Sequence, residues 1–141
     1  MENKQIILFK NLKIFSLNIK YLLNYIHAEY KLNKLIIISC MNPHSFCLFK
    51  ENYKYKSSII NTSIILVDGF LFWLLLKFKF IFTHRITGYD LLEKIIKEAY
   101  VKRIFLLGST VANLMKVKKV ILSDRGDLVI DYYSPPFVNS F

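Results

Sequence analysis

Asp68 is the residue whose position in this sequence points most directly to chemistry. It ends an apolar run in the stretch IILVDGFLFW (residues 64–73), and it is the only carboxylate between Glu51 and Asp90. A carboxylate at the end of a buried strand commonly serves as a general base facing a cleft, or as the N-cap of a following helix. Gly69 allows the backbone to turn sharply there or a ligand to approach closely. The pattern leaves both interpretations of Asp68 open.

Polar residues also follow the other apolar runs. Asn42 precedes Pro43 after one β-branched run, Gly108 and Ser109 follow another, and Arg85 lies in the segment HRITGYD. Each has an ordinary structural explanation, such as an Asx turn for Asn42 or a solvated surface charge for Arg85. A phosphate-binding turn is the functional alternative for Gly108.

The sequence predicts no metal and no cofactor. Cys40, His44 and Cys47 form a loose cluster of metal-ligand types, but Pro43 interrupts the helix that would align them. Neither a G-x-G-x-x-G fingerprint nor a Walker motif is present. Two cysteines are too few for a disulfide framework, so a reducing cytoplasm is the expected environment.

The elements that must position these residues follow from apolar periodicity. Short β-branched runs are typical of buried strands, and apolar stripes at i, i+3 and i+4 are typical of helices. We expect strands at 34–41, 63–68, 103–110 and 127–133, and helices at 18–31, at 88–100 and in a stretch reaching residue 120. Strands that are apolar on both sides indicate an α/β, Rossmann-like fold with a mostly parallel sheet and helices on both faces. Ligands bind such folds at the carboxyl ends of the strands.

Local signals also predict how the helices begin. Pro43 suits the first turn of a helix, and Ser109 or Thr110 suits an N-cap. Asp90 with Glu93 resembles a capping box, in which two side chains satisfy the free amides of a first helical turn.

The net charge of +10 suggests a polyanionic partner, although codon bias in a genome rich in A and T would also enrich lysine. The segment KENYKYK (residues 50–56) mixes lysines with Tyr53 and Tyr55, as in modules that stack bases. No nucleic-acid-binding motif accompanies it, so no nucleic acid is expected as a partner.

The segment GFLFWLLLKFKFIF (residues 69–82) is the most apolar in the chain. Its uncharged run ends at Lys77, which is too short to span a bilayer, and the lysines of residues 1–20 argue against a signal peptide. A core helix is the favoured interpretation, and a helix lying at a membrane interface is the alternative.

Five motifs, taken in order and spacing, resemble the WecG/TagA/CpsF glycosyltransferase family. They are MNPHSF (41–46), ILVDG (65–69), HRITGYDLL (84–92), IFLLGST (104–110) and YSPPF (133–137). The resemblance covers nearly the whole chain. It implies transfer of an N-acetylmannosamine-type sugar from a UDP-sugar donor to a polyprenyl-diphosphate-linked acceptor, with inversion. The products belong to teichoic acid, common antigen or capsule synthesis, at the cytoplasmic face of the membrane.

The same resemblance assigns roles to individual residues. Asp68 is the implied general base, and Arg85 stabilises the charge on the departing UDP without a metal. Asn42 orients substrate, and Gly69 and Arg85 are also expected to bind it. Gly108 and Ser109 correspond to the nucleotide-facing turn.

The chain also departs from the family pattern. The family's domain continues past the proline pair with further strands and a basic membrane appendage, whereas this sequence stops at PPFVNSF. We therefore expect one incomplete domain over residues 1–141, with an uncovered sheet edge that favours oligomers. An inactive truncated fragment and one half of a split enzyme are the alternatives to an active transferase.

Overall fold

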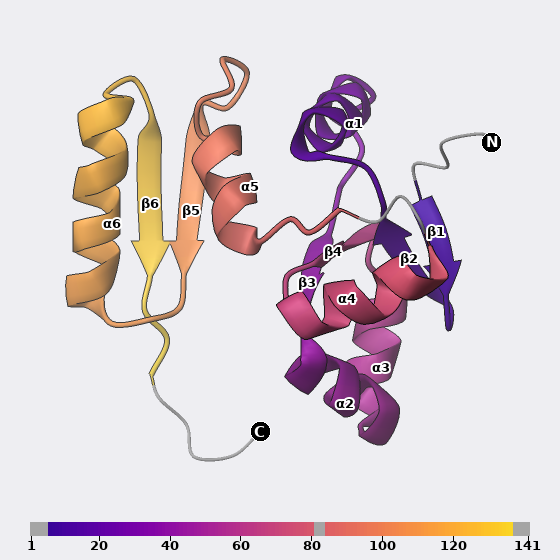
Figure 1. Ribbon diagram of the computed structural model, residues 1–141. Coiled ribbons are helices and arrows are strands. Elements are labelled where there is room, and N and C mark those ends of the chain that lie inside the picture. The colour runs from indigo at the N-terminus through magenta and orange to yellow at the C-terminus, as the bar shows by residue number, and fades with distance from the viewer. Residues whose placement is uncertain (1–5, 81–83, 137–141) are drawn as a thin grey trace. The chain divides into compact units, whose positions relative to one another are not determined.

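The computed structural model describes residues 6–80 and 84–136, and the chain forms two compact units, residues 1–91 and 92–141 (Figure 1). The fold is α/β with mostly parallel strand pairing, as predicted. None of the helices in the described ranges combines the length and apolar character needed to cross a bilayer. The assignment of the whole chain to one domain stays a prediction.

The first unit is built on a four-stranded sheet. The strand order is β1 (Ile6–Phe9), β2 (Leu12–Phe15), β4 (Ile64–Val67) and β3 (Ile38–Met41). β2 and β3 both run parallel to β4, and β1 pairs antiparallel with β2 at the edge. Because β2, β3 and β4 are parallel, their carboxyl ends meet at one edge of the sheet.

The β1–β2 hairpin was not predicted. Its two-residue turn is Lys10-Asn11, and both residues have positive φ angles, 49° and 67°. These values are those of a type I′ turn, whose twist matches that of paired antiparallel strands. Asn11 favours such a turn, but lysine is uncommon in it, so Lys10-Asn11 predicts the hairpin only weakly.

Helices cover both faces of this sheet. α2 (Pro43–Glu51), α3 (Tyr53–Ile60) and α4 (Phe70–Lys79) pack on one face, where the buried core includes Ile14, Ile65 and Val67. Phe15 points to the opposite face, because successive strand residues alternate. There it contacts Tyr25 of α1 (Ile19–Lys31) with ring centroids 6.3 Å apart.

The second unit contains the parallel pair β5 (Arg103–Leu107) and β6 (Val129–Tyr133), with α6 (Val111–Asp124) against them. Its core consists of Ile96, Ile121, Leu128 and Ile130. The strands that were predicted to start at 34, 103 and 127 are all shorter at one end than expected. β3, for example, begins at Ile38, which is its first residue to pair with β4 and lies opposite Ile64.

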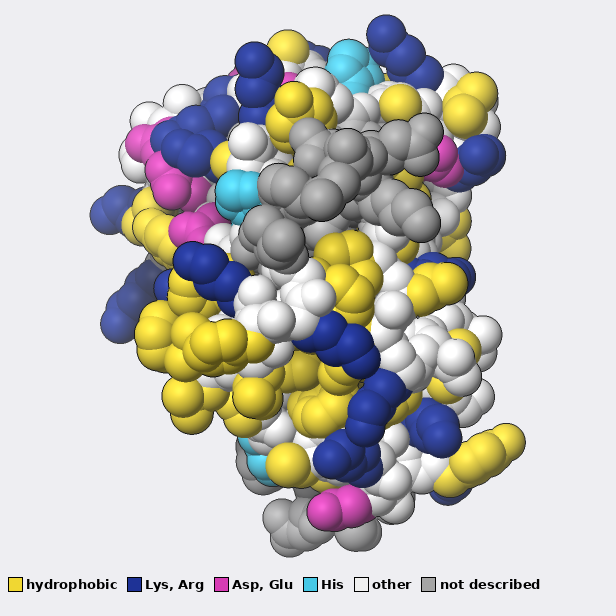
Figure 2. All heavy atoms as spheres, turned by 45° about the vertical axis from the view of Figure 1, so that its right-hand side comes forward, with side chains coloured by type: hydrophobic (Ala, Val, Ile, Leu, Met, Phe, Trp, Pro, Cys, Tyr) yellow, Lys and Arg dark blue, Asp and Glu magenta, His cyan; other side chains and the backbone are white. Residues whose placement is uncertain are grey.

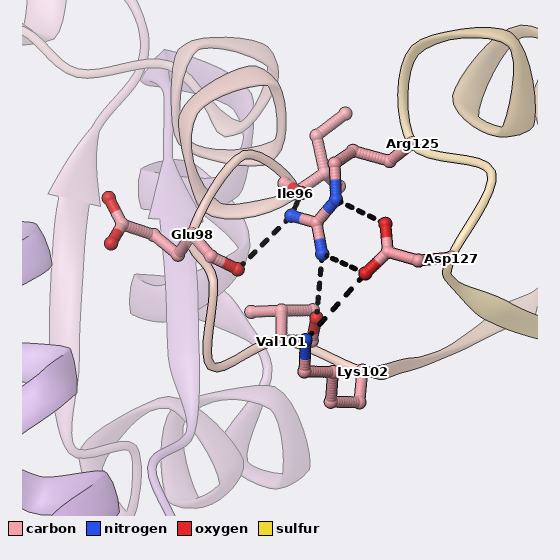
Figure 3. Close-up of polar contacts among 6 residues, drawn as sticks. All are labelled: Ile96, Glu98, Val101, Lys102, Arg125 and Asp127. Carbon is pink, nitrogen blue, oxygen red and sulfur yellow. Dashed lines mark hydrogen bonds and ion pairs between the residues drawn. The ribbon is translucent and has the colours of Figure 1, made fainter.

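α5 (Gly88–Ile95) is shorter than the predicted helix 88–100, and Arg125 provides the physical reason (Figure 3). The Arg125 guanidinium donates to the backbone carbonyls of Ile96, Glu98 and Val101 at 2.9, 3.3 and 3.3 Å. It also binds both carboxylate oxygens of Asp127, at 2.7 and 2.8 Å. The backbone carbonyls in the turns after α5 therefore accept hydrogen bonds from Arg125 instead of from the amides of a continued helix.

The predicted capping box of Asp90 with Glu93 is wrong. The Asp90 carboxylate accepts from the backbone amide of Thr87 at 2.9 Å, and the Thr87 hydroxyl accepts from the amide of Asp90 at 3.0 Å. The box therefore begins at Thr87, three residues earlier. Pro43 in the first turn of α2 and Thr110 as the N-cap of α6 are confirmed.

The Arg125–Asp127 pair predicts an acid-dependent stability. The hydrogen bonds from Arg125 hold the pKa of Asp127 well below its usual range. The stabilisation is therefore fully present above about pH 4, the unfolded pKa of aspartate, and is lost as the pH falls below it. Asp127→Asn should lower the urea midpoint at pH 7, and its difference from wild type should shrink below pH 4. Exposed Asp124→Asn is the control, and a constant difference at all pH values would contradict the argument.

Candidate active site

The candidate site lies at the carboxyl edge of the first unit's sheet. Ser16, Asn42 and Asp68 directly follow β2, β3 and β4. A later segment crosses this edge: the His84 amide donates to the Ser16 carbonyl at 3.2 Å, and the Ile86 amide donates to the Val67 carbonyl at 3.1 Å. Arg85 is thereby held between two anchored neighbours at the strand ends.

Arg85 and Asp68 are joined through the backbone. The Arg85 Nε donates to the carbonyl oxygen of Asp68 at 2.9 Å. Within residues 6–80 and 84–136, neither the Asp68 carboxylate nor the Arg85 guanidinium takes part in an ion pair. The structure therefore fixes Arg85 on the backbone of Asp68 and leaves the two charged groups without an ion pair among the described residues.

Asp68 is not a helix cap. Gly69 is the N-cap residue of α4, and no side chain caps this helix. The Asp68 amide donates to the Met41 carbonyl at 3.0 Å, which extends the β3–β4 pairing by one residue. The capping interpretation of Asp68 is thus excluded, and its half-buried carboxylate is left for another use.

Gly69 is required by a close approach of the backbone. A Cβ atom there would lie 2.6 Å from the Pro43 ring and 3.2 Å from both Cα and Cβ of Asn42. Real Cβ atoms do not approach other atoms that closely, and Pro43 is rigid. Only glycine allows the turns that follow β3 and β4 to touch.

Asn42 has a defined structural role. Its side-chain oxygen accepts from the Ser45 amide at 2.9 Å, and the Ser45 hydroxyl accepts from the Asn42 amide at 2.8 Å. This capping box starts α2, so Asn42 is a helix N-cap and not the predicted Asx turn, in which its oxygen would accept from the amide two residues on. Its side-chain nitrogen donates to none of the described residues, which leaves it for a ligand.

Cys40 is a neighbour of the site that the sequence did not assign. Burial, and secondarily the Asp68 carboxylate, raise the pKa of its thiol. A raised pKa favours the neutral thiol and disfavours the thiolate that acts as a nucleophile. Among the described residues, no three side chains of the His, Cys, Asp or Glu type are placed to hold a metal ion, so Cys40, His44 and Cys47 do not gather as a site.

Gly108 and Ser109 lie in the second unit, in the turn after β5. Both have positive φ angles, 100° and 61°. The Ser109 carbonyl accepts from the Ser134 hydroxyl at 2.7 Å, and the Gly108 amide donates to the Tyr133 carbonyl at 3.0 Å. The structure thus groups Asn42, Asp68, Gly69 and Arg85 in one unit, and forms the Gly108-Ser109 turn in the other.

The comparison with protein families is consistent with this geometry. The family model for the glycosyl transferase WecG/TagA/CpsF family matches residues 7–140. The chain belongs to this family. No curated protein matches it. Membership supports a glycosyltransferase-like function, while the individual roles of the site residues remain proposals.

The contact at Gly69 predicts a loss of stability on substitution. Gly69→Ala must displace Asn42 and Pro43, and we expect it to lower the free energy of unfolding by about 1–3 kcal/mol. Gly126→Ala is the matched control, because its new methyl group would meet the Leu122 carbonyl at an ordinary 3.7 Å. Thermal unfolding followed by circular dichroism measures both. Equal unfolding midpoints for the two variants would show that Asn42 and Pro43 move aside without loss of stability.

Proposed function

We propose that this protein is an inverting glycosyltransferase that moves an N-acetylmannosamine-type sugar from a UDP-sugar to a polyprenyl-diphosphate-linked acceptor. One observation carries the proposal: the Asp68 carboxylate, which has no ion pair among the described residues, lies at the carboxyl end of a central parallel strand, and Arg85 is bound to the carbonyl of that same residue. A base and a fixed cation are the two groups that this reaction needs.

In the proposed reaction, the acceptor hydroxyl loses its proton to the Asp68 carboxylate as its oxygen attacks the anomeric carbon. The new carbon–oxygen bond forms on the face opposite the departing UDP, so the configuration inverts. The bonding electrons leave with the β-phosphate of UDP, and Arg85 stabilises this added charge. Asn42 orients the substrate with its free amide nitrogen, and Gly69 keeps the approach open.

The second unit supplies the proposed nucleotide-facing turn. Two consecutive residues with positive φ, Gly108 and Ser109, precede the N-terminus of the 14-residue helix α6. The Gly108 amide is bound to the Tyr133 carbonyl, so the proposed donors to a phosphate are the amides of the first turn of α6, where the helix dipole also favours negative charge. Because the acceptor is linked to a lipid, the proposed location is the cytoplasmic membrane surface.

The first test is transfer from radiolabelled UDP-N-acetylmannosamine to a short-chain polyprenyl-diphosphate-GlcNAc. Asp68→Asn should lower turnover at least about a hundredfold, because the amide accepts no proton, while UDP-sugar binding stays near wild type. Asp124→Asn, a surface substitution of the same type, should change neither. Unchanged turnover in Asp68→Asn would remove Asp68 as the base.

Arg85→Ala should slow transfer by about a hundredfold and weaken UDP binding, because the leaving phosphate loses its cation. Arg103→Ala is the control, since Arg103 is exposed and makes only a long 3.9 Å ion pair with Asp131. Thermal unfolding of both variants separates a catalytic effect from loss of the Asp68 carbonyl contact. A normal rate in Arg85→Ala would make this arginine a surface charge.

The same assay decides between the proposal and its alternatives. No product with any of a panel of UDP-sugars would favour an inactive fragment. If transfer then appears on adding the C-terminal half of another family member, the chain acts as one half of a split enzyme.

A further inference from the structure

α4 carries apolar residues on both its inward and its outward side, yet only the inward side packs in the core. Phe72 and Leu76 point inward and are buried, as the core-helix interpretation predicted. The outward residues form a stripe at positions i, i+1, i+4, i+5 and i+8, and no described element covers it. The stripe consists of Phe70, Leu71, Leu74, Leu75 and Phe78, of which Leu74 is half-buried and the rest are exposed, with Phe78 at 85%.

Lysines border this stripe on both edges. At 100° per residue, Lys77 and Lys79 fall on opposite sides of the outward face. The Lys77 Nζ lies 4.6 Å from the centroid of the Trp73 ring, and the Lys79 Nζ lies 5.4 Å from that of Phe9. These contacts hold the charged groups beside the apolar stripe instead of across it.

The surroundings of α4 are basic as well. Lys10 and Lys50 both lie over the ring of Phe46, which packs against the same core. Asp68 is the only carboxylate between Glu51 and Asp90. Figure 2 shows a face on which hydrophobic side chains gather next to lysine and arginine side chains. An apolar stripe with a positive border is complementary to a bilayer of anionic lipids.

We propose that the outward stripe of α4 inserts into the interfacial layer of an anionic membrane, with Lys77 and Lys79 at the level of the phosphate headgroups. The helix has 10 residues, which is about 15 Å, so it lies in the interface and does not cross it. A second copy of the chain is a poorer occupant, because a symmetric contact through this stripe would bring the lysines of both copies together.

If the proposed function holds, this placement also brings the membrane surface close to the Asp68 carboxylate. α4 begins at Phe70, two residues after Asp68, so a membrane that receives the stripe also presents its surface to the candidate base. A lipid-linked hydroxyl would reach Asp68 without leaving the bilayer surface. The membrane contact itself does not depend on sugar transfer.

The single tryptophan, Trp73, lies on α4 but packs against the core, so the probe is a tryptophan placed in the stripe by Phe78→Trp in a Trp73→Phe background. The full chain is mixed with vesicles of phosphatidylglycerol and dibrominated phosphatidylcholine, whose bromine atoms quench only a tryptophan that enters the lipid. We expect quenching and co-sedimentation with these vesicles, and at least about tenfold weaker binding to vesicles of phosphatidylcholine alone. Quenching that is absent on anionic vesicles would overturn the proposal.

Matched variants locate the contact. Leu75→Ser with Phe78→Ser should weaken binding at least about tenfold without changing the unfolding midpoint, because both side chains are exposed. Leu35→Ser removes a leucine that is 84% exposed, close to the 85% of Phe78, and should bind as wild type. Lys77→Glu with Lys79→Glu should weaken binding to anionic vesicles, whereas Lys20→Glu with Lys31→Glu on α1 should weaken it less.

Three results would refute the stripe as the membrane contact. The first is equal vesicle binding by the Leu75/Phe78 and Leu35 variants. The second is an equal loss of vesicle binding in the two double-lysine variants. The third is a dimer that sediments without vesicles and disappears in the Leu75/Phe78 variant. The transfer assay with a short-chain acceptor is run separately in detergent. Failure there with normal vesicle binding rejects the proposed function and leaves this inference standing.

Discussion

The candidate site depends on one steric constraint, the contact of Gly69 with Asn42 and Pro43. Two parallel strands, β3 and β4, end side by side, and the turns that follow them must lie almost on top of one another. Glycine is the only residue that leaves room, since even a Cβ atom would lie 2.6 Å from the proline ring. This contact brings the starts of α2 and α4 together, and with them Asn42 and Asp68.

Given that constraint, the polar atoms at the sheet edge divide into those used by the fold and those left over. The Asn42 oxygen caps α2, the Asp68 amide continues the strand pairing, and the Asp68 carbonyl binds Arg85. The Asp68 carboxylate remains without an ion pair among the described residues. If this carboxylate served only as a cap, it would accept a hydrogen bond from an amide in the first turn of α4. No such bond forms.

The second unit is organised by a charge instead of by a steric contact. Arg125 collects three backbone carbonyls and one carboxylate, and it is the hydrogen-bond donor for the turns between α5 and β5. Its side chain is 18% exposed, so the bonds to the three carbonyls are partly shielded from water, whereas Asp127 is 52% exposed. The two units thus solve the same problem, satisfying backbone groups in tight turns, by different means.

The sequence by itself determined the alternation of strands and helices, the parallel α/β class and the family, because apolar periodicity and short motifs at fixed spacing are local properties. It also marked Asp68, Arg85, Asn42 and Gly69, though only as separate residues. Tertiary structure decided what the local pattern left open: that Asp68 is no cap, that Arg85 binds its carbonyl, and that α5 stops at Ile95. Each of these outcomes depends on a partner that is distant in sequence or on the space left by a neighbouring turn, and neither can be read from residue spacing.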